Sequence, residues 1–64
     1  MRLHRGQIFE NTLLKREAMV VEIQNGGQMG LLRFIDTNED EWVSSDEIDA
    51  DAEWHLKTDM GAGG

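Results

Sequence analysis

The chain has 64 residues, no cysteine and a formal net charge of −7. A chain this short forms one domain at most and needs help from a metal ion or a partner chain to be very stable. Disulfides and thiolate metal sites are excluded by the absence of cysteine. No apolar run approaches the roughly 20 residues that cross a membrane, and no signal-peptide core follows the first residue, so we expect a soluble protein without a membrane partner.

Charge is unevenly distributed along the chain. Residues 1–35 contain five Lys or Arg and three Glu, a balance of +2, whereas residues 36–64 contain ten acids and one Lys, a balance of −9. An acidic half of this kind repels nucleic acid, which we therefore exclude as a partner. It favours a metal cation, a basic peptide or protein, or the chain's own basic N-terminal half.

The N-terminal part is predicted to be a flexible arm followed by a helix. Residues 1–6 are short and basic, and we expect them to form the arm. From residue 7 to residue 24, apolar residues recur at three-to-four spacing, and good helix formers dominate from Thr12 to Ala18. We predict a helix over 7–24, although Met19 to Ile23 is rich in β-branched residues and also suits a strand.

Asn25-Gly26-Gly27 interrupts this pattern. Asn-Gly is typical of a tight hairpin turn, and it also occurs where a helix ends. As a hairpin, the segment would pair Val20–Ile23 with residues near Met29–Leu32. As a hinge, it would lead into a second, short helix near 28–35. We favour the hinge and keep a hairpin or short β-bridge around 19–32 as the alternative.

A third helix is predicted near 45–58. Ser44 and Glu47 have the spacing of a capping box, in which the serine accepts a hydrogen bond from the backbone of the first turn. Ile48 and Leu56 follow at helical spacing, and acidic residues are favourable near a helix start. The Gly-rich residues 61–64 are predicted to be a flexible tail, which leaves 7–60 as the domain.

Oxygen-bearing side chains alternate between the second and third predicted helices. They are Asp36, Asn38, Asp40, Ser44 and Glu47, at places 1, 3, 5, 9 and 12 of a twelve-residue frame. This spacing resembles the calcium-binding loop of the EF-hand family, whose hard cation takes six to eight oxygen ligands at about 2.3–2.6 Å. The resemblance implies that these five side chains and the backbone carbonyl of Trp42 would be the metal ligands.

Two features of this loop are unusual. Glu41 stands at place 6, where the family has a glycine for a sharp turn, and this implies weaker binding or a distorted turn. The residues FIDTN, Asp40, Trp42 and Asp46-Glu47 are also similar to engineered lanthanide-binding tags, in which a tryptophan at place 7 sensitises lanthanide emission. That similarity leaves open an artificial or selected origin with a grafted loop.

Together these patterns predict a mostly α fold, a single EF-hand-like helix-loop-helix with an additional N-terminal helix. The predicted function is binding of Ca²⁺ or a trivalent lanthanide, coupled to folding or to homodimerisation. The alternative is a metal-free interaction module whose acidic helix 45–57 binds a basic peptide or protein. Catalysis is not predicted, because the chain has no nucleophile with an adjacent base, no phosphate-binding glycine loop and no histidine-rich metal set.

Overall fold

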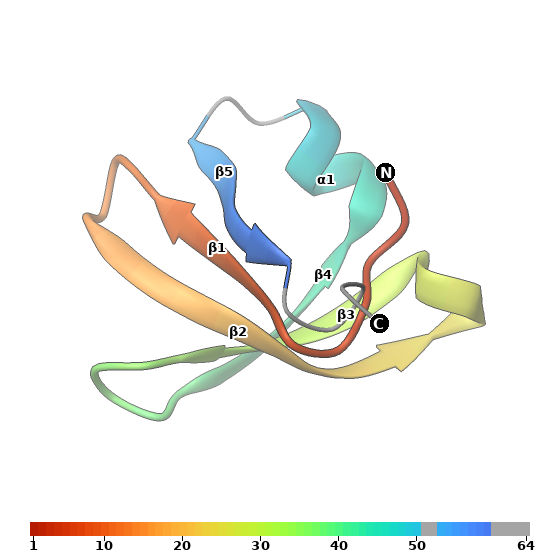
Figure 1. Cartoon of the computed structure of the whole chain (residues 1–64), viewed down its shortest axis with the longest axis horizontal. Helices are drawn as coiled ribbons and strands as arrows, with labels where there is room; N and C mark the ends of the chain where they lie inside the picture. The colour runs from red at the N-terminus through yellow and green to blue at the C-terminus, as the bar shows by residue number, and fades with distance from the viewer. Residues whose placement is uncertain (51–52, 60–64) are drawn as a thin grey trace.

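The computed structural model describes residues 1–50 and 53–59 and shows a curled, five-stranded antiparallel sheet with one short helix (Figure 1). The strands are β1 (Gln7–Asn11), β2 (Arg16–Gln24), β3 (Met29–Phe34), β4 (Asp40–Ser44) and β5 (Trp54–Asp59). A tight turn, η1 (Asn25–Gly27), joins β2 to β3, and the helix α1 (Ser45–Ala50) follows β4. The strand order is β4-β3-β2-β1-β5, so the last strand returns to lie beside the first.

The predicted mostly α fold and its helix-loop-helix are wrong. The segment predicted as helix 7–24 forms β1 and β2, and the segment predicted as helix 28–35 forms β3. The third predicted helix begins as expected but ends at Ala50, and β5 occupies the rest of its range from Trp54. The predicted tail, 61–64, lies outside the described residues.

Local helix propensity misled the prediction at the turn between β1 and β2. Leu13 and Leu14 are good helix formers, but their side chains are 68% and 53% exposed at the tip of this hairpin. The side-chain oxygen of Asn11 accepts a hydrogen bond from the backbone N–H of Leu14 at 2.9 Å, and Lys15 adopts a φ of 56°. A left-handed residue cannot continue a helix, so the chain reverses here.

The hairpin around 19–32, the alternative to the hinge, is the structure that forms. Val20 pairs with Leu32, and Ile23 pairs with Gly30. Asn25 and Gly26 have φ values of 54° and 66°. The backbone N–H of Gln28 donates to the carbonyl of Asn25, so Gly26 and Gly27 are the central residues of this turn. Gly27 also has a positive φ, of 97°, and glycine adopts this conformation at the lowest steric cost.

The core lies inside the curl of the sheet. Its fully or almost fully buried apolar residues are Leu3, Phe9, Ala18, Val20, Leu32, Phe34, Val43 and Ile48. Ladder irregularities between Val20 and Glu22 and between Ile8 and Phe9 indicate bulges, which increase strand twist. The curl brings β5 opposite β3, where the rings of Phe34 and Trp54 lie 6.3 Å apart.

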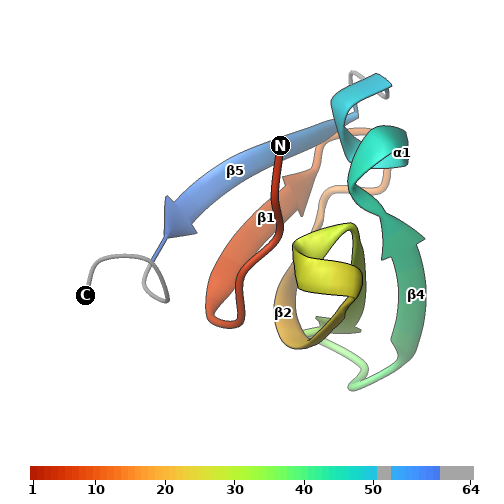
Figure 2. The ribbon, with the colours of Figure 1, turned by 90° about the vertical axis from the view of Figure 1, so that its right-hand side faces the viewer.

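The N-terminal residues, which we expected to be a flexible arm, cross one end of this curl (Figure 2). Leu3 is completely buried, and its backbone N–H donates to the carbonyl of Gly27 at 2.8 Å. Gly30 leaves the room that Leu3 needs, because a Cβ added there would lie 2.7 Å from Leu3 Cδ1. No helix in the described part of the chain is long and apolar enough to cross a bilayer.

Candidate binding face at β4 and α1

The first two predicted metal ligands, Asp36 and Asn38, lie in the turn between β3 and β4. The carboxylate of Asp36 accepts hydrogen bonds from the guanidinium of Arg16 at 3.2–3.3 Å. Asn38 has a φ of 61°, and its backbone N–H donates to the carbonyl of Phe34 at 2.7 Å. The sharp turn that the family places at Glu41 therefore occurs at Asn38, and Glu41 lies in a strand.

The other four predicted ligands follow one another along β4 and into α1. Asp40 accepts hydrogen bonds from Arg33 Nε at 2.8 Å and Nη2 at 3.1 Å, and Trp42 is 45% exposed in the middle of the strand. Ser44 Oγ accepts a hydrogen bond from the backbone N–H of Glu47 at 3.1 Å, which confirms the predicted helix cap. Glu47 lies in the first turn of α1.

This arrangement does not fit a bound Ca²⁺ or lanthanide ion. A strand rises about 3.3 Å per residue, so the backbones of Asp40 and Ser44 lie about 13 Å apart, several times the reach of one metal–oxygen shell. Two of the carboxylates, Asp36 and Asp40, are already paired with arginines. Within the described residues no group of three or more His, Cys, Asp or Glu is placed to hold a metal ion. Metal binding by these residues stays a prediction that would require β4 to rearrange.

Four of the outward side chains of β3 and β4 form a surface that we call the Trp42 face: Met29, Leu31, Trp42 and Ser44. The outward pair Arg33 and Asp40 borders it. Alternation along the strands sends Leu32 and Val43 into the core and these four to the other side. Leu31 is directly opposite Trp42, and Met29 is opposite Ser44. The face therefore combines an exposed indole with two half-buried apolar side chains.

A pocket of about 300 Å³ lies at the end of this face where β4 leads into α1. It is lined by Asn25, Gln28, Met29, Ser44, Ser45 and Asp46. The backbone N–H of Ser45 donates to the carbonyl of Gln28 at 2.8 Å, which holds the start of α1 against the start of β3. The lining offers an apolar thioether, amide and hydroxyl groups, and one carboxylate.

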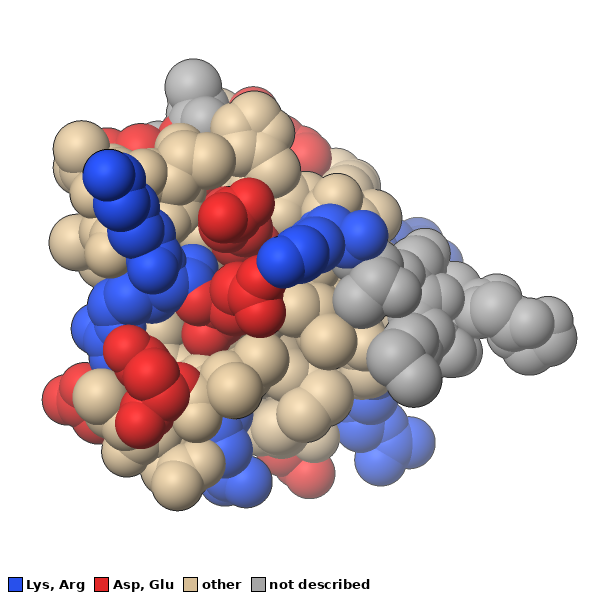
Figure 3. All heavy atoms as spheres, turned by 60° about the vertical axis from the view of Figure 1, so that its left-hand side comes forward, with Lys and Arg blue, Asp and Glu red and all other residues tan. Residues whose placement is uncertain are grey.

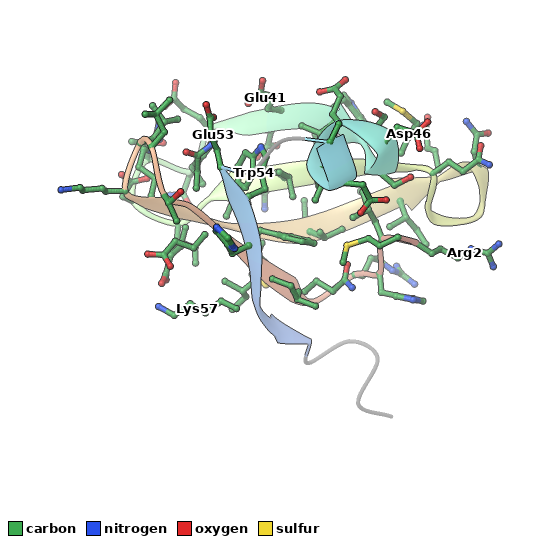
Figure 4. The ribbon with its side chains drawn as sticks, turned by 90° about the horizontal axis from the view of Figure 1, so that it is seen from above. Arg2, Glu41, Asp46, Glu53, Trp54 and Lys57 are labelled. Carbon is green, nitrogen blue, oxygen red and sulfur yellow. The ribbon has the colours of Figure 1, made fainter. Side chains whose placement is uncertain are left out.

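Three carboxylates of β4 and α1 have no cationic partner among the described residues: Glu41, Asp46 and Glu47. Asp49, further along α1, is paired with the N-terminal amino group. Figure 4 places Glu41 and Asp46 on the β4 side of the molecule and Lys57 on the opposite side. The β4 side therefore keeps uncompensated negative charge.

The other end of the molecule is different, because acidic and basic side chains are interleaved there (Figure 3). Arg16 pairs with Asp36 and Glu39, and its guanidinium lies 4.1 Å from the ring centre of Phe34. Its hydrogen bond to Asp36 raises the pKa of Arg16. Lys57 pairs with Glu17, and that hydrogen bond raises the pKa of Lys57. These charges are already compensated within the chain.

Sequence reasoning selected Trp42, Ser44 and Glu47 but missed the residues that β3 and η1 contribute. The sequence pattern predicts a short helix for Gln28, Met29 and Leu31 and a hinge for Asn25. The signal that would have found them was the Asn-Gly turn, because a hairpin at that turn pairs 29–32 with β2 and so makes this segment a strand. The second reversal, at Asn38, then sets Leu31 and Met29 beside β4.

Neither a family model, nor a curated protein, nor a solved structure matches this chain.

Proposed function

We propose that this domain is a metal-free, non-enzymatic interaction module that binds a basic protein segment along the Trp42 face and the adjoining pocket. The observation that carries this proposal is the pocket itself, which joins an exposed apolar surface to the carboxylate of Asp46, a group with no cationic partner among the described residues. Asp46 belongs to the acidic segment that the sequence indicated as a docking element. The sequence predicted this segment to be a helix over 45–57. In the structure the docking element is instead the end of β4 followed by the short helix α1.

The apolar part supplies affinity that is independent of charge. An exposed tryptophan flanked by a leucine and a methionine is the kind of residue set that carries binding energy in protein interfaces, because a large rigid ring loses little entropy on contact. Trp42 is held by its strand and stands directly opposite Leu31, so the face exists before a partner arrives. A partner with apolar side chains gains by covering it.

The polar part supplies selectivity for a cationic side chain. Met29 can contact the aliphatic stem of a lysine or arginine, while the carboxylate of Asp46 accepts hydrogen bonds from its charged end. Glu41 and Glu47 add negative potential on the same segment, which increases the association rate of a basic partner. An acidic partner would be repelled.

The test is a titration with a synthetic peptide, acetyl-Lys-Val-Lys-Val-Lys-Val-Lys-amide, followed by calorimetry. We expect saturable binding that weakens as salt is raised and that EDTA leaves unchanged, because no metal takes part. The matching Glu-Val peptide should not bind. Absence of binding by the lysine peptide at low salt would overturn the proposed function, and binding that EDTA abolishes would favour the metal hypothesis.

Charge-removing variants locate the site. Asp46→Asn should weaken binding of the lysine peptide about two- to fivefold, as expected for one partly exposed ion pair. Glu10→Gln is the matched control, because it removes one negative charge from β1, three strands away from β4. Both variants should keep the wild-type amide spectrum. Equal weakening by the two would show that only net charge matters and that the pocket does not.

A further inference from the structure

We infer that the partner binds as an extended strand added to the free edge of β4, so that its backbone as well as its side chains is recognised. This inference rests on the proposed function and specifies the form of the basic segment. β4 is the terminal strand of the sheet, and no other strand in the described part of the chain lies on its far side (Figure 2).

The hydrogen bonds at the two ends of the β3–β4 ladder show which backbone groups are free. Phe34 N–H donates to the carbonyl of Glu39, and Ser45 N–H donates to the carbonyl of Gln28, both at 2.8 Å. Hydrogen-bonded and non-hydrogen-bonded pairs alternate in an antiparallel ladder. With the observed register, Glu41 and Val43 belong to the hydrogen-bonded pairs, whereas Asp40, Trp42 and Ser44 do not.

The backbone groups of these last three residues therefore point away from β3. The N–H and C=O of Asp40 and Trp42 and the N–H of Ser44 face the outer edge, while the carbonyl of Ser44 is used by the first turn of α1. The edge thus offers three donors and two acceptors, centred on Trp42. An extended segment can pair with them as it would with a neighbouring strand.

Charge decides what kind of segment fits this edge. Asp40 is neutralised by Arg33, but Glu41 in β4 and Asp46 and Glu47 at its end have no cationic partner among the described residues. A second copy of this chain would bring the same acidic strand against itself at a net charge of −7 per chain, which is unfavourable. A basic segment gains from the same charges, so the acidic edge excludes the chain's own copies and admits a cationic strand.

Two variants at one position test the backbone contribution. Trp42→Ala and Trp42→Pro both remove the indole, but only proline also removes the outward N–H. Both should fold, because proline is tolerated in an edge strand where the N–H faces solvent. We expect Trp42→Pro to bind the Lys-Val peptide at least tenfold more weakly than Trp42→Ala. Equal affinities of the two folded variants would overturn strand addition.

Amide hydrogen exchange of the wild-type protein gives a second, independent readout. In the free protein, the amides of Glu41 and Val43 should be protected, and that of Trp42 should exchange quickly. Saturation with the Lys-Val peptide should slow exchange at Trp42 at least tenfold. Binding without protection at Trp42 would leave the proposed function standing and overturn strand addition. Protection of Trp42 that increases with protein concentration in the absence of peptide would show that a second copy covers the edge, which also overturns the inference.

Discussion

Arg33 and Asp40 form an ion pair between β3 and β4 beside the Trp42 face. The two residues are directly opposite each other on β3 and β4, in a non-hydrogen-bonded pair whose side chains lie close together. Arg33 engages both carboxylate oxygens of Asp40. This hydrogen bonding holds the pKa of Asp40 below its ordinary value of 3.8 and raises the pKa of Arg33.

We predict that the carboxyl group of Asp40 titrates below pH 3.8 in a carbon-detected NMR titration. A lowered pKa in the folded state means that the stabilisation is present above the unfolded value and is lost as pH falls through the folded value. Arg33→Gln should therefore return the midpoint toward 3.8, whereas Lys57→Gln, which affects a pair with Glu17, should leave it unchanged. An unshifted midpoint in the wild-type protein would contradict the ion pair.

The wrong prediction of a helix-loop-helix arose mainly from β4 and the turn before it, which were interpreted as a metal-binding loop. The ligands of an EF-hand loop alternate along the sequence, and so do the outward side chains of a strand, so Asp36, Asn38 and Asp40 fit both patterns. Glu41 was the distinguishing residue. A strand needs no positive φ at that position, and the turn is made earlier, at Asn38.

The N-terminal segment contributes to the core, which the sequence pattern did not indicate. Leu3 lies between basic residues and was assigned to a flexible arm, yet it is completely buried. Its site is made by a glycine in the middle of β3, and an isolated glycine in a strand often marks a close approach of another part of the chain. The sequence could have suggested that another side chain packs against Gly30 only if Gly30 had been recognised as a strand residue.

We predict that Leu3→Ala lowers the free energy of unfolding by about 2–5 kcal/mol in urea denaturation followed by tryptophan emission, as for other leucines removed from cores. This is a large part of the total, because a domain of this size has about 3–10 kcal/mol. The matched control is Leu13→Ala, which removes the same atoms from a side chain that is 68% exposed. It should change the free energy of unfolding by no more than about 0.5 kcal/mol.

A double-mutant cycle tests the contact between Leu3 and Gly30 directly. Gly30→Ala should destabilise the wild-type protein, because its Cβ would lie 2.7 Å from Leu3 Cδ1. In the Leu3→Ala background the clashing methyl is gone, so the same change should cost about 1 kcal/mol less. Additive effects of the two substitutions in urea denaturation would mean that Leu3 does not occupy this site.

At the scale of the whole molecule, the sequence indicated local features better than the architecture. The acidic C-terminal half, the Ser44 cap and the Asn-Gly turn were recognisable because each depends on neighbouring residues. The pairing of β5 with β1 was not, because it joins segments more than 40 residues apart and no local pattern encodes it. Leu13 and Leu14 favour a helix locally, and they dominated the prediction for 7–24. The strands that form there are determined instead by pairing with distant parts of the chain.

Both proposals depend on β4 being the outer strand paired with β3. The most direct test is a nuclear Overhauser spectrum of the uniformly labelled protein, recorded in EDTA and again with excess Ca²⁺. We predict strong contacts between the Hα protons of Leu31 and Trp42 and between those of Arg33 and Asp40 in both conditions, because non-hydrogen-bonded pairs bring these protons together. Sequential helical contacts through 28–35 in place of these cross-strand contacts, in either condition, would contradict the account.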